Sequence, residues 1–149
     1  MSTDYKRPES VLVVIHTPDL QVLLLERAKH PGYWQSVTGS REVGESFSEA
    51  AIREVGEETG LIIPIGQLRA WPGENVYEIM PEWRHRYAPD VTHNRERVFS
   101  ICLPNTCDIL MSPTEHRNWR WSPAQEAAAA CFSASNREAI LALAEQSAC

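Results

Sequence analysis

Two apolar runs near the start of the chain predict buried strands. Residues 10–17 form a continuous β-branched run, and residues 21–27 form a second apolar run. Such runs are typical of strands covered on both faces. Because the Thr-Pro-Asp between them supplies turn chemistry, we expect a hairpin over residues 10–27. A short strand over 34–38 follows the next loop.

Helical periodicity begins after residue 46. Ser46 with Glu49 three positions later matches a capping box, and Gly60 is placed to end a helix in the left-handed conformation. We therefore expect a helix over 47–58. Its apolar residues share an arc that can pack on a core: Ala51, Ile52 and Val55.

The rest of the chain predicts more strands and two further helices. The expected strands cover 61–71, 75–80, 97–103, 108–111 and 116–121. Pro123 belongs in the first turn of a helix that continues to residue 130. Ser135 with Glu138 repeats the capping pattern and predicts a terminal helix to about Ser147. This irregular alternation favours an α+β fold, a mixed β-sheet with helices on both sides, over a βα barrel or a helical bundle.

Length and charge narrow the class of protein. A chain of 149 residues without a linker or repeat predicts a single domain over residues 1–149. Its net charge of −6 argues against binding to a nucleic acid polymer or an anionic membrane. No apolar run is long enough for a membrane span, and nothing resembles a signal peptide, so we expect a cytoplasmic protein. The oligomeric state stays open.

The cysteines show no C-x-x-C pair and no zinc-ligand spacing. In a cytoplasmic protein we therefore expect reduced thiols. This expectation covers Cys102, Cys107, Cys131 and Cys149.

Three glutamates share one face of the predicted helix. Glu54, Glu57 and Glu58 stand at i, i+3 and i+4, within an arc of about 100°. Each like-charge pair at this spacing costs about 0.2–0.5 kcal/mol, and only Arg53 lies beside them. The face is either a solvated acidic surface or a site for a hard divalent cation. Mg²⁺ binds a few carboxylates together with substrate phosphates.

The pattern around these carboxylates resembles the Nudix box. Every defined position of the box is matched, at Gly39, Glu45, Arg53, Glu54, Glu57, Glu58, Gly60 and Leu61. The chain is therefore identified as a suspected Nudix hydrolase, and the resemblance implies an α/β/α sandwich. The segments 34–40, 85–89 and 114–116 resemble the subfamily that hydrolyses dihydroneopterin triphosphate in folate biosynthesis.

The resemblance implies that Glu54 and Glu58 bind Mg²⁺, with Mn²⁺ as a possible substitute. The carbonyl of Gly39 often joins such ligands. A carboxylate outside the box often closes the site, and Glu115 in Thr-Glu-His matches that position. The alternative for Glu115 is an ordinary surface residue.

Two further box residues are candidates for catalysis. Glu57 either completes the metal shell or orients the attacking water. Arg53 is expected to pair with a box glutamate and fix its orientation. Glu45 either structures the loop or contacts the metal through water.

Candidate substrate contacts come from several segments. Arg27 ends the second strand and Lys6 precedes the first, so a hairpin would bring both to one side as phosphate ligands. Arg84 and Arg86 are further candidates. A flat pterin ring needs apolar walls and a few polar contacts, for which we consider Tyr77, Glu78, Ile79, Met80 and Ser133. Thr38 adjoins Gly39 and is expected near the phosphates. Burial in the core, or solvent exposure, is the alternative for each of these.

Other conspicuous side chains are given no role in the site. We expect Trp34, Trp119 and Trp121 in the core. The five histidines lack metal-ligand spacing and are assigned nothing.

The sequence thus predicts Mg²⁺-dependent hydrolysis of dihydroneopterin triphosphate to the monophosphate and pyrophosphate. Two alternatives remain. The same chemistry on nucleoside triphosphates or damaged nucleotides would use the same box, because the box contacts phosphates and not the ring. A Nudix-fold binding module without catalysis is the second alternative, although such modules usually lack the box carboxylates.

Overall fold

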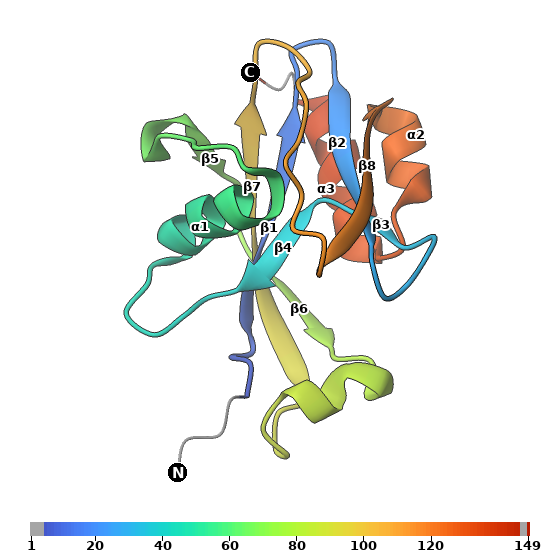
Figure 1. The fold of residues 1–149 in the computed structure, drawn as a ribbon. Helices are drawn as coiled ribbons and strands as arrows, with labels where there is room; N and C mark the ends of the chain where they lie inside the picture. Colours follow the sequence, from blue (N-terminus) through green and yellow to red (C-terminus); the bar gives the residue numbers. More distant parts are fainter. Residues whose placement is uncertain (1–4, 147–148) are drawn as a thin grey trace.

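The fold is built around two parallel strands at the centre of a mixed sheet (Figure 1). The computed structural model describes residues 5–146 and 149. Strand β1 (Glu9–His16) pairs with β7 (His93–Cys102) over its full length. No helix among these residues is long and apolar enough to cross a membrane.

Six further strands complete the sheet in the described part of the chain. They are β2 (Gln21–Arg27), β3 (Trp34–Gln35), β4 (Val37–Ser40), β5 (Leu68–Ala70), β6 (Asn75–Glu78) and β8 (His116–Pro123). The central order is β3-β2-β1-β7-β5; β4 also pairs with β1, β6 with β7, and β8 with β2. Among the strand pairs of the described residues, only β1–β7 is parallel, so the sheet is mixed.

Helices cover both faces of this sheet, because the side chains of β1 alternate between two cores. Val11, Val13 and Ile15 pack beneath α1 (Phe47–Thr59). Leu12 and Val14 face the opposite core, which is closed by α2 (Ala124–Ala130) and α3 (Ala134–Glu145). The predicted α+β sandwich is confirmed, with α1 on one side and α2 and α3 on the other (Figure 1). The predicted core placement of the tryptophans is also confirmed, because Trp34, Trp119 and Trp121 pack against these cores.

The predicted hairpin over residues 10–27 is confirmed only next to its turn, although both of its strands are present. β1 and β2 pair only where His16 lies opposite Val22. Along the first half of β1 the neighbour is β4, and β2 pairs mainly with β8. The turn therefore joins two strands that diverge, and the space between them is filled from later in the chain.

The other predicted elements differ mostly at their ends. The box helix is confirmed, with its capping box at Ser46 and Gly60 at φ 76°. The strand predicted over 61–71 shrinks to β5, after a short 3₁₀ turn, η1 (Ile65–Gln67). A second such turn, η2 (Pro81–Arg86), follows β6. The strand predicted over 108–111 is absent.

The start of the last helix is a further correction. Ser133 caps α3, because its hydroxyl accepts a hydrogen bond from the Asn136 backbone N–H at 3.2 Å. Ser135, the predicted cap, lies inside the helix. Pro123 likewise precedes α2 as its cap. The predicted end at Ser147 lies outside the described residues.

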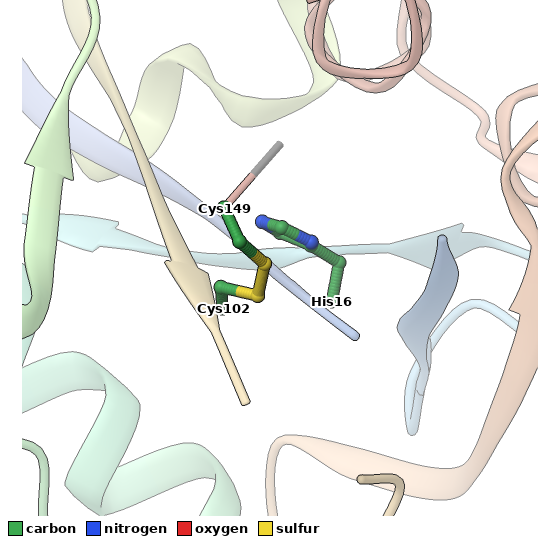
Figure 2. A group of neighbouring side chains, drawn as sticks. All are labelled: His16, Cys102 and Cys149. Atoms are coloured by element: carbon green, nitrogen blue, oxygen red, sulfur yellow. A yellow bond between two sulfur atoms is a disulfide. The ribbon is translucent and has the colours of Figure 1, made fainter. Parts of the chain in front are cut away.

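The expectation of four reduced thiols is wrong for one pair. Cys102, at the end of β7, forms a disulfide with Cys149 beside the ring of His16 (Figure 2). Cys107 and Cys131 are free thiols. The sequence spacing did not show this pair, because the bond joins residues separated by 47 positions.

Candidate metal and substrate site

The site begins where α1 packs against β4. Gly39, in β4, lies so close to Glu54 that a Cβ atom at position 39 would overlap the glutamate carboxylate. The glycine at the first position of the box therefore leaves the volume in which this carboxylate sits. Glu54 is 8% exposed and Glu58, one turn later, is 1% exposed. Two of the three predicted carboxylates are therefore directed into the protein and not toward bulk water.

Burial changes the charge state of this pair. Desolvation raises the pKa of Glu54 to about 7. Desolvation, followed by the negative charge of Glu54, raises the pKa of Glu58 well above its usual range. Oε1 of Glu58 is buried and has no hydrogen-bond partner among the described residues. An unpaired buried carboxylate is costly, and a bound cation removes that cost.

A third carboxylate reaches the pair from the far end of the chain. The backbone N–H of Ala28 donates to the carbonyl of Glu115 at 2.9 Å, which ties the loop before β8 to the end of β2. Ligand atoms of Glu58, Glu115 and His116 then lie within 4.8 Å of one another. The residues fit a divalent cation, since they combine hard carboxylate oxygens with an orphaned buried acceptor.

His116 is a site residue that the sequence analysis left unassigned. Its ring is 3% exposed, with Nε2 at 3.3 Å from Nε2 of Gln35 and 3.9 Å from Oε1 of Glu58. Burial, followed by the charge of Arg27, lowers the pKa of His116 to about 4. The imidazole is therefore neutral at physiological pH. Its position directly after Glu115 was the available signal.

Glu57 lies apart from the buried pair. Its side chain is 54% exposed, and Nη1 of Arg53 donates to both of its carboxylate oxygens at 3.3 Å. The three glutamates share a helical arc, as predicted, but only two of them face the sheet. Glu57 therefore remains open to the cleft and to solvent.

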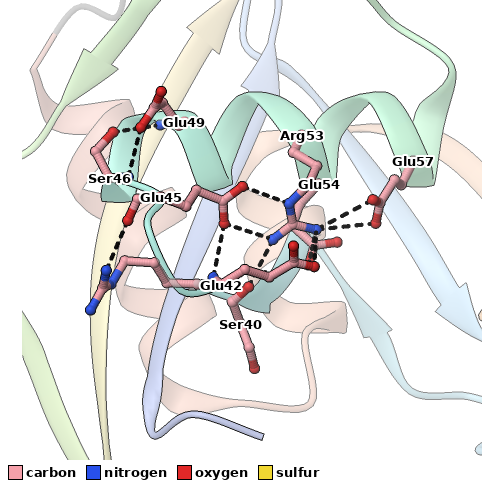
Figure 3. A network of polar contacts seen from close by, with 9 residues as sticks. Ser40, Glu42, Glu45, Ser46, Glu49, Arg53, Glu54 and Glu57 are labelled. Carbon is pink, nitrogen blue, oxygen red and sulfur yellow. Dashed lines mark hydrogen bonds and ion pairs between the residues drawn. The ribbon is translucent and has the colours of Figure 1, made fainter.

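Arg53 organises the loop that precedes the helix (Figure 3). It holds Glu45 in a bidentate pair at 2.7 and 3.0 Å, and it donates to the carbonyl of Ser40 at 2.9 Å. Its Nη1 also lies 3.4 Å from Glu54. The predicted pairing of Arg53 with box glutamates is confirmed, and Glu45 contributes to the loop structure.

Positive charge gathers next to the buried carboxylates. Desolvation, then the nearby charges of Arg86 and Arg27, lower the pKa of Lys6 to about 8. The negative charges of Glu54 and Glu115 lie close enough to Lys6 to oppose this lowering of its pKa. The backbone N–H of Lys6 donates to the carbonyl of Arg86 at 2.9 Å. The three cations are adjacent, and the carboxylates of Glu54, Glu58 and Glu115 offset their mutual repulsion only in part, an arrangement suited to a polyanion.

The residues predicted for catalysis, metal binding and substrate binding line one cleft of about 1530 Å³, whereas Glu45 and Arg84 do not line it. These include the catalytic and metal candidates, the cations and the proposed ring contacts: Lys6, Arg27, Thr38, Arg53, Glu54, Glu57, Glu58, Tyr77, Glu78, Ile79, Met80, Glu115 and Ser133. Two of them have other partners. The hydroxyl of Ser133 caps α3, and Glu78 forms an ion pair with Arg84. Ile79 is almost fully buried.

An aromatic group forms another wall that the sequence did not indicate. Tyr33 stacks on His30 and on Phe132, with ring centroids 5.2 and 4.7 Å apart. Trp83 meets Phe132 edge-on and carries the guanidinium of Arg27 over its ring at 5.3 Å. These rings come from three separate segments of the chain, so no local pattern connects them.

The chain is similar to known proteins in both sequence and structure. The model of the NUDIX domain family matches residues 6–143. The dihydroneopterin triphosphate diphosphatase of Escherichia coli K12 is 46% identical over 139 residues, covering 91% of each chain. The enzyme of that name from Haemophilus influenzae is 39% identical, covering 91% of this chain and 87% of its own. The structure of the E. coli dihydroneopterin triphosphate pyrophosphohydrolase superposes with a TM-score of 0.86 at 45% identity, covering 93% of this chain and 95% of that one.

Proposed function

Because the chain belongs to the NUDIX domain family, we propose that it hydrolyses dihydroneopterin triphosphate to dihydroneopterin monophosphate and pyrophosphate. The observation that carries the proposal is one cleft in which buried carboxylates lie next to the cations Lys6, Arg27 and Arg86. The relatives named above supply the substrate, because they are whole-length matches with that activity in their names.

Nudix enzymes typically depend on a divalent metal, and we assign its binding here to Glu54, Glu58 and Glu115 with Mg²⁺ as the ion. Mn²⁺ is expected to substitute, since both ions take carboxylate oxygen ligands. When bound, such an ion neutralises phosphate charge and lowers the pKa of bound water. The raised pKa of Glu54 and Glu58 means that ion binding releases protons from this pair.

Lys6 and Arg27 are proposed to hold the triphosphate. Both lie beside the carboxylates in the cleft, and Arg86 adds a third charge. Binding a polyanion here raises the pKa of Lys6 back toward its ordinary value, because the substrate offsets the repulsion from its cationic neighbours. Lys6 is therefore more fully charged when the substrate is bound than when the cleft is empty.

Glu57 and Arg53 are proposed to act in the catalytic step through water and orientation. Glu57 is exposed at the cleft, where its carboxylate can accept a proton from an incoming water. Arg53 links Glu57 and Glu54 to the backbone at Ser40, so it fixes both carboxylates relative to β4. Arg53 is therefore a positioning residue.

The pterin ring is proposed to lie against the wall formed by Tyr77 to Met80, and Thr38 is proposed to lie near the phosphates. The Tyr77 hydroxyl accepts a hydrogen bond from Asn94 at 3.0 Å, which fixes the ring of this tyrosine. Met80 is 41% exposed and offers an apolar surface. Ser133 is the remaining candidate, at the edge of the cleft.

A substrate panel with product identification tests the proposal. Dihydroneopterin triphosphate and the common nucleoside triphosphates are compared for kcat/KM in the presence of Mg²⁺. We expect preference for the pterin substrate, with pyrophosphate as the first product and no prior orthophosphate. Hydrolysis in ¹⁸O-water then identifies the phosphorus that is attacked. Preference for a nucleotide would assign the chain to the first alternative, and tight binding without turnover would assign it to the second.

A further inference from the structure

A second group of ligating side chains lies at the opposite end of β1 from the cleft. His16 is the last residue of β1 and pairs across the ladder with Cys102, the last residue of β7. Cys149 completes the group (Figure 2). One ligand atom from each of the three residues lies within 4.8 Å of the other two. Nothing in the proposed hydrolysis uses these side chains.

The imidazole of His16 is held in the tautomer in which Nε2 can bind a metal ion. The ring is completely buried, and its Nδ1 lies 3.0 Å from the carbonyl of Thr17. A carbonyl only accepts, so Nδ1 carries the proton and Nε2 has a free lone pair. Nε2 is buried without a hydrogen-bond partner among the residues that the structure describes.

This arrangement is typical of metal-binding histidines. Such residues donate their second ring N–H to a backbone carbonyl or a carboxylate, which sets the tautomer and the ring orientation. An orphaned buried nitrogen next to two sulfur atoms needs an explanation that packing alone does not supply.

We propose that His16, Cys102 and Cys149 form a binding site for Zn²⁺ when the Cys102–Cys149 disulfide is reduced. Two thiolates and one imidazole supply three of the four ligands of a tetrahedral zinc centre and leave one position for water or another ligand. Two thiolates also balance the charge of the ion. The disulfide form in the structure is the metal-free state of the same site.

A small-molecule thiol can convert the disulfide state into the reduced, metal-binding state. Two equivalents of that thiol reduce the disulfide to two cysteine thiols and become a disulfide themselves, so two electrons and two protons are transferred. Zn²⁺ then replaces the two thiol protons. Cys149 is an exposed residue and Cys102 is partly buried.

Cobalt substitution tests the site without relying on turnover. The protein is reduced with a phosphine, freed of reductant under inert gas and titrated with Co²⁺. A thiolate-to-cobalt charge-transfer band in the near ultraviolet reports sulfur ligation, which the carboxylates of the cleft cannot give. We expect the band to saturate at a single Co²⁺ per chain, to disappear on addition of Zn²⁺ and to be absent from the oxidised protein.

Variants separate this site from adventitious thiol binding. Cys149→Ser should abolish the two-sulfur band. Because Cys149 is exposed, we expect the variant to fold, which circular dichroism checks. His16→Gln should weaken Co²⁺ binding by about tenfold or more. Cys107→Ser is the matched control and should retain the band. An absent band in the reduced wild-type protein, or an unchanged band in Cys149→Ser, overturns the proposal.

Discussion

The two rims of the cleft are built in different ways. The box rim, residues 39–61, is one continuous stretch whose strand, loop and helix hold each other in place. The assembled rim brings together Lys6, Arg27, Tyr77–Met80, Arg86, Glu115 and Ser133, from six separate segments. The box rim carries the paired carboxylates, and the assembled rim carries the positive charge.

This difference separates chemistry from recognition. Contacts within the box rim span few residues: Arg53 reaches Glu45, Glu57 and Ser40, all within 13 positions. Such a unit can be kept intact while the surrounding chain varies. The assembled rim depends on the whole sheet for its geometry, so changes there alter which substrate is held. Variants on each rim should therefore affect different kinetic constants.

The largest effect is expected from Glu58→Gln on the box rim. The change removes one negative charge without altering shape, so the fold should remain. We expect kcat to fall by about 100-fold or more, since the proposed metal site loses a buried ligand. Glu126→Gln, at an exposed position of α2, is the matched control and should leave kcat unchanged. Near-normal turnover in folded Glu58→Gln would remove Glu58 from the metal site.

On the assembled rim, Arg27→Met should act mainly on KM. The guanidinium lies among Glu58, Glu115 and Arg86, and its loss removes a phosphate contact. We expect KM to rise by about tenfold or more, with a smaller change in kcat. Arg117→Met is the control, because Arg117 is half exposed and has only a long ion pair to Glu26. A fall in kcat at constant KM would place Arg27 in the chemical step instead.

Glu115→Gln tests whether the two rims share the metal. If Glu115 is a ligand, the Mg²⁺ concentration for half-maximal rate should rise by about tenfold, equivalent to about 1.4 kcal/mol. The exposed Glu126→Gln again serves as the reference titration. Indistinguishable titrations of the two variants would confine the metal site to the box rim.

The protonated state of the buried pair predicts a pH dependence of folding. Folded Glu54, with its pKa near 7, retains a proton that the unfolded chain releases near its ordinary value of 4.5. Its contribution to stability is complete below pH 4.5 and is lost as pH rises through 7, by at most about 1.4 kcal/mol per pH unit. Urea unfolding in the presence of a chelator gives the free energy of unfolding at each pH. The difference in this free energy between wild type and Glu54→Gln measures the contribution of Glu54. The opposite slopes from His16 and His116, whose pKa values are lowered, cancel in this difference.

If the difference in free energy of unfolding between wild type and Glu54→Gln, measured without metal, does not change between pH 4.5 and 7, the raised pKa of Glu54 is contradicted. In saturating Mg²⁺ the slope of the wild-type protein should change sign within this window. Protons then leave the folded state when the metal binds, and stability rises with pH.

The smallest effect is expected from Ser133→Ala. Loss of the α3 cap should lower the free energy of unfolding by about 1 kcal/mol or less, and Ser133→Asn should restore most of it. KM should change little, because the hydroxyl accepts the Asn136 N–H. A raised KM at unchanged stability would make Ser133 a substrate contact.

The sequence predicted the box rim almost completely, because its determinants are local. Ser46, Glu49 and Gly60 delimit α1 through contacts within a few residues, and the capping box forms as expected. The split between the buried Glu54 and Glu58 and the exposed Glu57 was not predicted. It depends on which part of the glutamate arc meets β4, a tertiary contact.

Long-range pairing explains most of what the sequence did not show. The start of α3 is an example, since Ser133 and Ser135 both suit a cap. Asn136 decides between them by binding Ser36, 100 positions away, through both its amide oxygen and its amide nitrogen. The neighbours of β1 and the approach of His16 to Cys102 likewise arise from sheet order, which local patterns do not contain.

Gly39 illustrates a constraint on substitution that differs from that at the glycines with positive φ. Gly32, Gly44, Gly60 and Gly73 have positive φ, where asparagine is often tolerated. Gly39 has no such backbone requirement, and its constraint is volume alone. Even a methyl group there would compete with the Glu54 carboxylate for the same space. A saturation library should therefore accept no replacement at 39 in the active protein, while alanine leaves the backbone conformation accessible and yields a folded chain whose glutamate is displaced from the ion.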